Sequence, residues 1–322
     1  MPQRIRMAPA TTLLGALVLC VGAGFAGPAQ AGLLAGCTPA PAHSAPVQDR
    51  LLQVAIWLRQ TLEATGGTVA LVARSGQALG AIGHRYSHAA LALRHNPQGP
   101  WAVRQLYFDC DALRPRIFDQ GLSGFVGGTH EPDHGFLQVV VLPPEAQHPL
   151  ETTALDDALA LQLLGNGYSA NAHAWSTTFQ NCNQWVAELL ATAWSPPPAT
   201  PVGRVAAQTS LRQLGYTPST IRAHWPPIAL GAALLPWFHT TDHPQSDVAA
   251  GRFVVSMPKA MAQWVQNLWP TSQTLELCHT AHHAVLRRNG PPLSDDCEPG
   301  PGDTVHPLHG AASMLGTLPM NP

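Results

Sequence analysis

Charged residues are scarce in this chain of 322 residues. Asp, Glu, Lys and Arg make up 11% of it, and the formal net charge at pH 7 is −2. A nucleic-acid partner requires a basic face, so this composition argues against nucleic-acid binding. The sequence also has no internal repeat and, beyond its first 31 residues, no second long apolar run. We therefore expect the rest of the chain to be soluble and to contain no transmembrane segment.

The N-terminus has the three parts of a secretory signal peptide. Two arginines lie in the first six residues, an apolar stretch covers 13–25, and Ala29-Gln30-Ala31 provides a cleavage site. The apolar stretch is short for a bilayer, which a helix of about 20 apolar residues spans. We predict that residues 1–31 are removed and that the protein is periplasmic or secreted. The alternatives are a retained anchor and a lipoprotein attached through Cys37, which ends a lipobox-like segment.

The number of cysteines is odd once the signal peptide is removed. Cys20 leaves with it, and five remain: Cys37, Cys110, Cys182, Cys278 and Cys297. Exported proteins fold in an oxidising compartment where cysteines usually pair, so one of the five has no intramolecular partner. We predict that this free thiol is Cys182 and that Cys278–Cys297 and Cys37–Cys110 are disulfides. Four cysteines allow three connectivities, and the sequence does not choose among them.

Hydrophobic periodicity predicts a mixture of helices and strands. We expect helices at 51–62, 150–164 and 182–194, and strands at 68–73, 86–93, 101–108 and 137–142. The second and third strands are separated by a turn and should form an antiparallel hairpin. The last strand is nearly all Val and Leu, which indicates a buried central strand.

The mature chain, of roughly 290 residues, is long enough for one large domain or two small ones. Composition divides it into three parts. We predict a domain at 32–200, a C-terminal extension at 201–280 packed on or beside it, and a Gly- and Pro-rich, mobile tail at 281–322.

Cys182 starts the best-defined predicted helix, a position that favours a reactive thiol. Backbone N–H groups at a helix N-terminus favour negative charge, which lowers the pKa of a thiol and populates the thiolate. The polar loop before the helix ends in Gln180 and Asn181, which we predict to donate hydrogen bonds to an oxyanion with the Cys182 N–H. The alternative is a small apolar side chain packed under the helix.

A thiol nucleophile requires a base, and His88 is our candidate. It starts an apolar strand and has small neighbours, which leave room for another group. We expect its ring within about 4 Å of the Cys182 sulfur, with Tyr86 as a substrate-binding residue beside it. Gln105, on the neighbouring strand, is our first choice for orienting the imidazole, and Asp109 is the second. A structural histidine bonded within the sheet is the alternative.

Two segments resemble a known superfamily. They are Arg-Tyr-Ser-His-Ala-Ala-Leu at 85–91 and Gln-Asn-Cys-Asn-Gln-Trp-Val-Ala-Glu-Leu-Leu at 180–190. Both are similar to the circularly permuted branch of the NlpC-type, papain-like thiol hydrolases, in which the His strand precedes the Cys helix. The resemblance implies an α+β fold with the Cys helix packed on an antiparallel sheet, plus a C-terminal extension here. It also implies a Cys nucleophile, a His base and a polar third residue. Many permuted members have a carboxylate or a His there, and Gln105 departs from them.

A narrower resemblance covers most of the mature chain. The region 74–194, with Phe118-Asp119-Gln120-Gly121, Tyr168-Ser169-Ala170-Asn171 and 180–188, is similar to an uncharacterised family of exported bacterial proteins. We expect acyl transfer through a thioester on Cys182, which water or another nucleophile resolves. The expected substrates are cell-wall peptides, other peptides or acyl lipids. We expect no metal and no organic cofactor.

Two rival predictions belong to other classes. Two sets of side chains at helical spacing suggest a metal-binding envelope protein: His279, His282 and His283, and His239, Asp242 and His243. Neutral exposed histidines are the simpler account of both sets. The other rival is a non-catalytic exported binding module that keeps the fold without the activity. Reaction of Cys182 with an electrophile at neutral pH distinguishes an enzyme from such a module.

Overall fold

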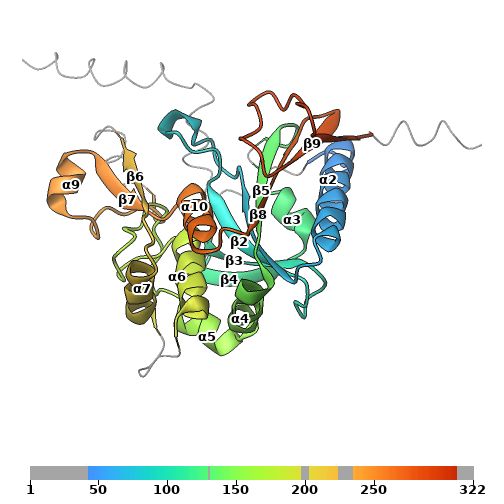
Figure 1. Ribbon diagram of the computed structural model, residues 1–322. Helices are drawn as coiled ribbons and strands as arrows, with labels where there is room; N and C mark the ends of the chain where they lie inside the picture. Colours follow the sequence, from blue (N-terminus) through green and yellow to red (C-terminus); the bar gives the residue numbers. More distant parts are fainter. Residues whose placement is uncertain (1–42, 130, 197–202, 224–234, 310–322) are drawn as a thin grey trace, which may run out of the picture. The chain divides into compact units, whose positions relative to one another are not determined.

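Eight strands form one antiparallel sheet in this computed structural model (Figure 1), which describes residues 43–129, 131–196, 203–223 and 235–309. In chain order they are β1 (Val69–Arg74), β2 (His88–Leu93), β3 (Ala102–Asp109), β4 (Arg114–Gln120), β5 (Gly135–Val141), β8 (Gln273–His279), β9 (His283–Arg288) and β10 (Thr304–Pro307). Across the sheet the order is β10-β9-β8-β5-β1-β2-β3-β4, and every neighbouring pair is antiparallel. The valine-rich β5 is therefore internal, as predicted.

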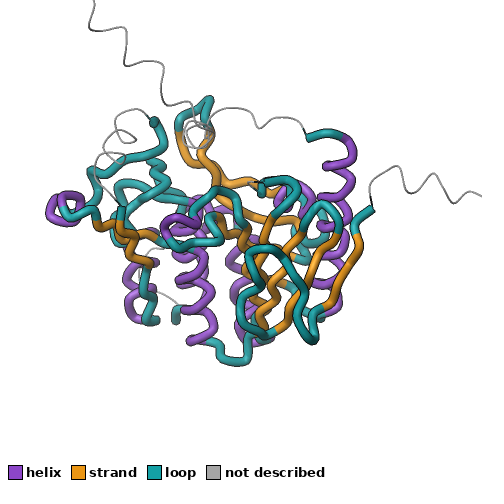
Figure 2. Tube along the Cα trace, turned by 90° about the horizontal axis from the view of Figure 1, so that it is seen from above, coloured by secondary structure: helices purple, strands orange, loops and turns teal. Residues whose placement is uncertain are grey.

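Helices cover both faces of this sheet (Figure 2). Since side chains alternate along a strand, successive residues of β1 point to opposite faces. Val72 packs with α2 (Ala45–Ala64) and α3 (Leu122–Val126), on what we call the α3 face. Leu71 packs with α4 (Pro144–Leu155), α6 (Cys182–Trp194) and α10 (Pro258–Leu268), on the α6 face.

The remaining described elements are short. They are the 3-10 helix η2 (Gly80–Ile82), the helices α5 (Asp157–Gln162), α7 (Arg204–Gln213) and α9 (Gln245–Ala249), and a two-stranded sheet of β6 (Ser219–Arg222) and β7 (Arg252–Val255). Where the structure describes the chain, no helix is both long and apolar enough to cross a membrane. The predicted signal peptide lies outside the described residues, so it stays a prediction.

Local signals account for both ends of α6. Asn181 is its N-cap, and the Asn181 Oδ1 accepts a hydrogen bond from the backbone N–H of Gln184 at 2.7 Å. The helix stops at Ser195, because Pro196 cannot continue it. Residues 182–191 are all buried, since α6 packs against β2, β3, α4 and α7.

The coarse fold prediction is confirmed: the protein is α+β, with a large antiparallel sheet on which α6 packs. The predicted hairpin is present, since β2 pairs with β3 and Leu91 lies opposite Arg104. The helix predicted at 150–164 is instead two helices, α4 and α5. They are separated at Asp156, whose side chain accepts a hydrogen bond from the backbone N–H of Leu159 and so caps α5.

Part of the extension predicted at 201–280, the strand β8, belongs to the main sheet, and the described part of the predicted tail, 281–309, contains two further strands of it. The strand β8 pairs with β5 over its whole length, and β9 and β10 extend the same sheet. The described residues fall within one compact unit. The last part of the chain has no periodicity because an irregular loop separates the two short strands β9 and β10, and such a loop leaves no repeating pattern.

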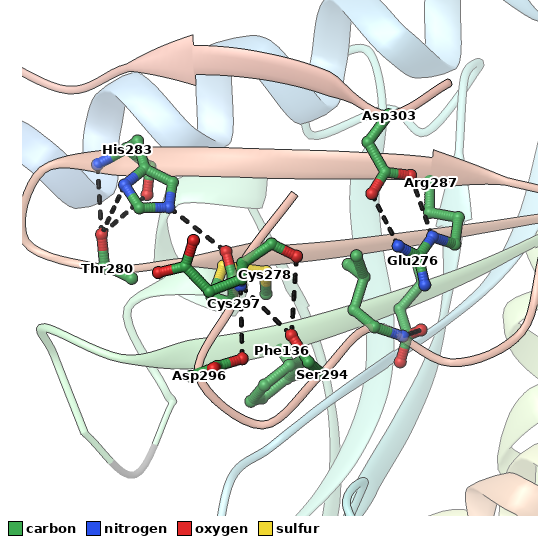
Figure 3. The surroundings of a disulfide bond; sticks show 12 residues. Phe136, Glu276, Cys278, Thr280, His283, Arg287, Ser294, Asp296, Cys297 and Asp303 are labelled. Atoms are coloured by element: carbon green, nitrogen blue, oxygen red, sulfur yellow. Dashed lines mark hydrogen bonds and ion pairs between the residues drawn. A yellow bond between two sulfur atoms is a disulfide. The ribbon is translucent and has the colours of Figure 1, made fainter. Parts of the chain in front are cut away.

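A disulfide between Cys278 and Cys297 holds that loop to the sheet (Figure 3). Near it, Arg287 of β9 binds both carboxylate oxygens of Asp303, at 2.9 and 2.7 Å. The predicted local pair is thus confirmed. Cys110 is disulfide-bonded as well, and its predicted partner Cys37 lies outside the described residues. Disulfides are typical of an oxidising compartment, so these bonds favour an exported protein.

Candidate functional site

Asn183 fixes the start of α6 against the backbone of β2. Its Oδ1 accepts a hydrogen bond from the N–H of Ala89 at 2.8 Å, and its Nδ2 donates one to the carbonyl of Ser87 at 3.0 Å. These two residues lie on either side of His88. The side chain that follows the predicted nucleophile therefore holds, by two hydrogen bonds, the backbone on both sides of the predicted base. We call this pair of hydrogen bonds the grip of Asn183.

This grip depends on a gap in the sheet. The strand β2 pairs with β3 only from Leu91 onward, so the first half of β2 has no partner on β3. In a continuous sheet the Ala89 N–H would donate to the neighbouring strand, and Asn183 takes that place. The start of α6, with Cys182, is thus held at the opening between β2 and β3.

Gln105 contacts His88 as predicted. The two atoms His88 Nε2 and Gln105 Oε1 are 2.8 Å apart. A carbonyl oxygen can only accept, so Nε2 carries the ring proton and Nδ1 is the unprotonated nitrogen of the neutral imidazole. The ring stacks on Tyr107, with centroids 4.8 Å apart. Asp109, our second choice, instead binds Arg116 at 2.8 Å and lies away from the imidazole.

The imidazole of His88 stays neutral over the physiological pH range. Burial, followed by the positive charge of Arg74, lowers the pKa of His88 to about 3, and the hydrogen bond with Gln105 opposes this shift only in part. A histidine with so low a pKa is unprotonated throughout that range. The ring is therefore unprotonated but only weakly basic, and a stable imidazolium is disfavoured.

The free thiol of Cys182 is also neutral. Among the described residues it is the free cysteine, as predicted, and it is 8% exposed. Burial raises the pKa of its thiol to about 11, against the opposing effects of backbone N–H groups and of Arg74. The prediction that the helix N-terminus yields a ready thiolate is therefore wrong, because desolvation outweighs it. The thiol bonds Asn183 Oδ1 at 3.6 Å and the Tyr168 hydroxyl.

The contact that we expected between the Cys182 thiol and the His88 ring is not found: no hydrogen bond joins these two groups, both of which the structure describes. Alternation places the His88 side chain on the α3 face, where it contacts Phe125 with ring centroids 6.2 Å apart. Cys182 belongs to the cluster of the α6 face. The charge of Arg74, which lies over Phe125 on the α3 face, nevertheless opposes the rise in the pKa of Cys182.

The three predicted oxyanion and substrate-binding side chains are engaged elsewhere, which corrects their assignment. Gln180 donates to Leu163 O and Glu188 and accepts from the Gly165 N–H. Asn181 caps α6 and donates to Ala170 O at 3.2 Å. The Tyr86 hydroxyl donates to Glu276. Each of the three side chains has hydrogen-bond partners within the fold, so none of them is held in place by the predicted role alone.

Tyr168, Tyr107 and Arg74 lie close to the thiol or to the imidazole and were not among the predicted site residues. Tyr168 bonds the thiol and packs on Phe108, with ring centroids 5.3 Å apart. Tyr107 stacks on His88, and its hydroxyl accepts a hydrogen bond from Arg74 Nη2 at 2.9 Å. Only Tyr168 carried a sequence signal, as part of a segment quoted for the narrower resemblance.

The histidine sets do not form the helical arrangement that their spacing suggested. His279 ends β8 and His283 starts β9, so that set lies on a hairpin. In the other set, His243 bonds Asn171 O at 2.7 Å, and Asp242 accepts from the backbone N–H of His173 at 2.8 Å. In the described parts of the chain, no group of three His, Cys, Asp or Glu residues could hold a metal ion.

Comparison with known proteins gives one match. No curated protein and no solved structure matches the chain. A family model matches residues 61–265, a range that contains His88, Gln105, Tyr168 and Cys182 and spans more than half of the chain. The chain therefore belongs to the bacterial family described as "Uncharacterized protein conserved in bacteria (DUF2145)".

Proposed function

We propose that the protein is an exported thiol hydrolase or acyltransferase of the circularly permuted papain-like type. The observation that carries this proposal is the pair of hydrogen bonds made by Asn183, which hold the helix start with a free cysteine against the backbone on both sides of His88, whose ring Gln105 orients. The order of the elements, with the His strand before the Cys helix, supports the same fold type. The substrate bond is an amide or ester in a peptide, a cell-wall peptide or an acyl lipid.

The reaction begins with two neutral groups. In the structure the thiol is bonded to Asn183 on the α6 face, so the proposed step requires it to reach the His88 ring through the opening between β2 and β3. There Nδ1 takes the thiol proton while the sulfur attacks the substrate carbonyl carbon. A carbon–sulfur bond forms, and the carbonyl oxygen becomes an oxyanion. The His88 imidazolium then gives the proton to the leaving nitrogen or oxygen as its bond to carbon breaks. In the resulting thioester, water or another nucleophile attacks, His88 takes its proton, and Cys182 leaves with that proton restored.

Oxyanion stabilisation is assigned to Tyr168 and the backbone rather than to the side chains predicted first. The N–H groups of Cys182 and Asn183 hydrogen-bond the sulfur, and the Tyr168 hydroxyl reaches the same atom. Donors that converge on the sulfur lie near the position that an oxyanion on the attacked carbon occupies. Tyr168 is held there because it forms a bridge with Gln180, next to the N-cap of α6.

A chromogenic ester tests the proposal without knowledge of the natural substrate. With p-nitrophenyl acetate we expect a burst of p-nitrophenol and an acetyl group on Cys182, located by peptide mass mapping. The variant Cys182→Ser should lose the burst, and His88→Gln should slow it about 10²- to 10⁴-fold, the range for loss of a general base. Acetylation of Cys182 no faster than in the unfolded chain would sink the proposal.

The pH profile of the same reaction tests the role of His88. Its base form is lost as the pH falls through its pKa, which lies at about 3 rather than near the ordinary 6.5. We therefore expect the acetylation rate of Cys182 to stay level on acidification from about pH 8 to about pH 5. An inflection near pH 6.5 would show that an ordinary histidine acts as the base and would contradict this assignment.

A second candidate function is a non-catalytic binding module. The burial of Cys182, with its raised pKa, favours this reading because buried thiols without a thiolate are commonly inert. Such a module would show neither the burst nor an effect of His88→Gln on acetylation of Cys182. The ester experiment therefore decides between the two candidates.

A further inference from the structure

Arg74 ends β1 beside the proposed site and is 6% exposed. Its guanidinium makes one side-chain hydrogen bond, from Nη2 to the Tyr107 hydroxyl at 2.9 Å. The other two nitrogens, Nε and Nη1, are buried and have no hydrogen-bond partner. No Asp or Glu of the described residues forms an ion pair with Arg74. A buried guanidinium with two unpartnered nitrogens and no counter-charge destabilises the fold.

The surroundings of Arg74 hold this charge in place. Its Cζ lies over the Phe125 ring, 5.6 Å from the centroid. Two glycines pack against the guanidinium: a Cβ on Gly76 would lie 2.4 Å from Nη1, and one on Gly128 would lie 2.6 Å from Cζ. Any larger side chain at either position would displace the group. The guanidinium therefore occupies a fitted place and does not extend to solvent, as an unpaired arginine otherwise does.

The field of Arg74 reaches both proposed reacting groups. Its charge lowers the pKa of His88 and opposes the rise in the pKa of Cys182. Tyr107, which Arg74 bonds, stacks on the His88 ring. An anion that satisfied the idle donors of Arg74 would therefore lie beside the atoms that carry out the proposed reaction.

We infer that Arg74 binds a carboxylate group of the substrate, next to the bond that Cys182 attacks. The inference rests on the proposed function. Both pairs of parallel N–H donors on a guanidinium include Nη2, which has a second N–H besides the one bonded to Tyr107. That N–H and one of the idle nitrogens match the two oxygens of a carboxylate, and desolvation strengthens the contact. The ligand supplies the missing negative charge, which makes an acyl group or leaving group with a nearby carboxylate the preferred substrate.

Access to Arg74 passes the loop of residues 75–87, which joins β1 to β2. Gly76 at its start covers Nη1 and is tied down by a hydrogen bond from its N–H to Ser87 Oγ at 3.0 Å. Residues 77–84 of the loop are exposed or half-exposed. A ligand can therefore reach the idle donors only if this backbone segment moves, because α3 closes the Phe125 side.

Two electrophiles that differ only in charge test the inference. Iodoacetate carries a carboxylate and iodoacetamide a neutral amide, and both alkylate the thiolate, so the ratio of their rates does not depend on the thiol pKa. We expect the rate with iodoacetate divided by the rate with iodoacetamide to be about tenfold or more higher at Cys182 of the folded wild type than in the unfolded chain. A factor of this size is what one charge-assisted hydrogen bond allows. A ratio equal to that of the unfolded chain overturns the inference without any variant.

Variants then assign the preference to Arg74. In Arg74→Gln the ratio should fall to the unfolded value, and Arg74→Lys should keep only part of the preference because it lacks the fork of donors. The matched control is Arg116→Gln, which removes the same charge from an exposed position on β4 and should leave the ratio unchanged. If Arg74→Gln slows the reactions with both reagents by the same factor, Arg74 only stabilises the thiolate of Cys182 and does not bind the carboxylate. The inference would then be wrong.

The failure of this inference and that of the proposed function are distinguishable. A preference for iodoacetate that depends on Arg74, without acetylation by p-nitrophenyl acetate, would leave a carboxylate-binding site in a protein that is not an acyl-transfer enzyme. Acetylation of Cys182 that depends on His88, without any preference for iodoacetate, would keep the enzyme and overturn the role of Arg74.

Discussion

Arg204 and Arg74 are buried to nearly the same degree, 8% and 6% exposed, yet only one of them has a counter-charge. Arg204 binds both oxygens of Glu188 on α6, at 2.9 and 3.1 Å. Arg104, 5% exposed, has a similar two-point pair with Asp119. Arg74 has the hydroxyl of Tyr107 and two idle donors. Among the described residues, Arg74 is thus the buried arginine without a carboxylate partner, and this contrast is the observation behind the proposed carboxylate site.

The paired arginine has a structural task that is visible in its other contacts. Besides Glu188, Arg204 donates to the carbonyls of Thr177, Ser176 and Phe179, in the loop that leads to Cys182. It thereby ties α7 to α6 and shapes the approach to the N-cap. The hydrogen bonds of Arg204 are thus made within the fold and help to specify it. Two nitrogens of Arg74, in contrast, have no hydrogen-bond partner at the proposed site.

The largest expected effect comes from breaking the buried ion pair of Glu188 and Arg204. In Glu188→Ala we expect the free energy of unfolding to fall by about 3–5 kcal/mol, because Arg204 is left as a buried charge without a partner. Urea denaturation followed by circular dichroism measures the change. The double variant Glu188→Leu/Arg204→Met should recover part of the loss, since it removes both charges. A single variant as stable as wild type would show that the pair contributes nothing to the fold.

A smaller loss is expected where α6 meets the gap in the sheet. Asn183→Ala leaves the Ala89 N–H and the Ser87 carbonyl without their partner, which should cost about 1–3 kcal/mol for buried groups. The acetylation rate of Cys182 should fall as well, because the start of α6 is no longer fixed beside His88. The control is Thr209→Ala on the exposed side of α7. It should change the free energy of unfolding by no more than about 0.5 kcal/mol and leave the acetylation rate as in the wild type. Normal acetylation in Asn183→Ala would contradict the positioning role of this side chain.

The smallest effect, and one of opposite sign, is expected at Arg74. Arg74→Met keeps much of the volume and removes an uncompensated buried charge, so the free energy of unfolding should rise by about 1 kcal/mol. Thermal unfolding of the purified variant measures it. A loss of stability comparable to that of Glu188→Ala would show that Arg74 belongs to the structural class, and the contrast between the two arginines would disappear.

The parts of the site that lie close together in sequence could be predicted. Asn181 and Pro196 bound α6 by local signals, and the hairpin of β2 and β3 brought Gln105 next to His88. The remaining contacts of the site join residues far apart in the sequence, or arise only when the segments pack together. The hydroxyl of Tyr86 meets Glu276, 190 residues away, and the thiol pKa follows from burial of Cys182 among segments that no local pattern joins. Local patterns specify elements and their caps, whereas desolvation and distant hydrogen bonds arise only in the assembled fold.

The pairing of β5 with β8 determines when, during synthesis, the sheet can be completed without exposing an apolar edge strand. Until residues 273–279 have been synthesised, β5 has β1 on one side and an open edge on the other. That edge carries Val139, Val140 and Val141, and an apolar strand with unpaired N–H and C=O groups is a template for association with other chains. Because the pairing joins distant segments, it also forms slowly. A chain cut at residue 200 would retain Cys182, His88 and Gln105 and would still be expected to aggregate.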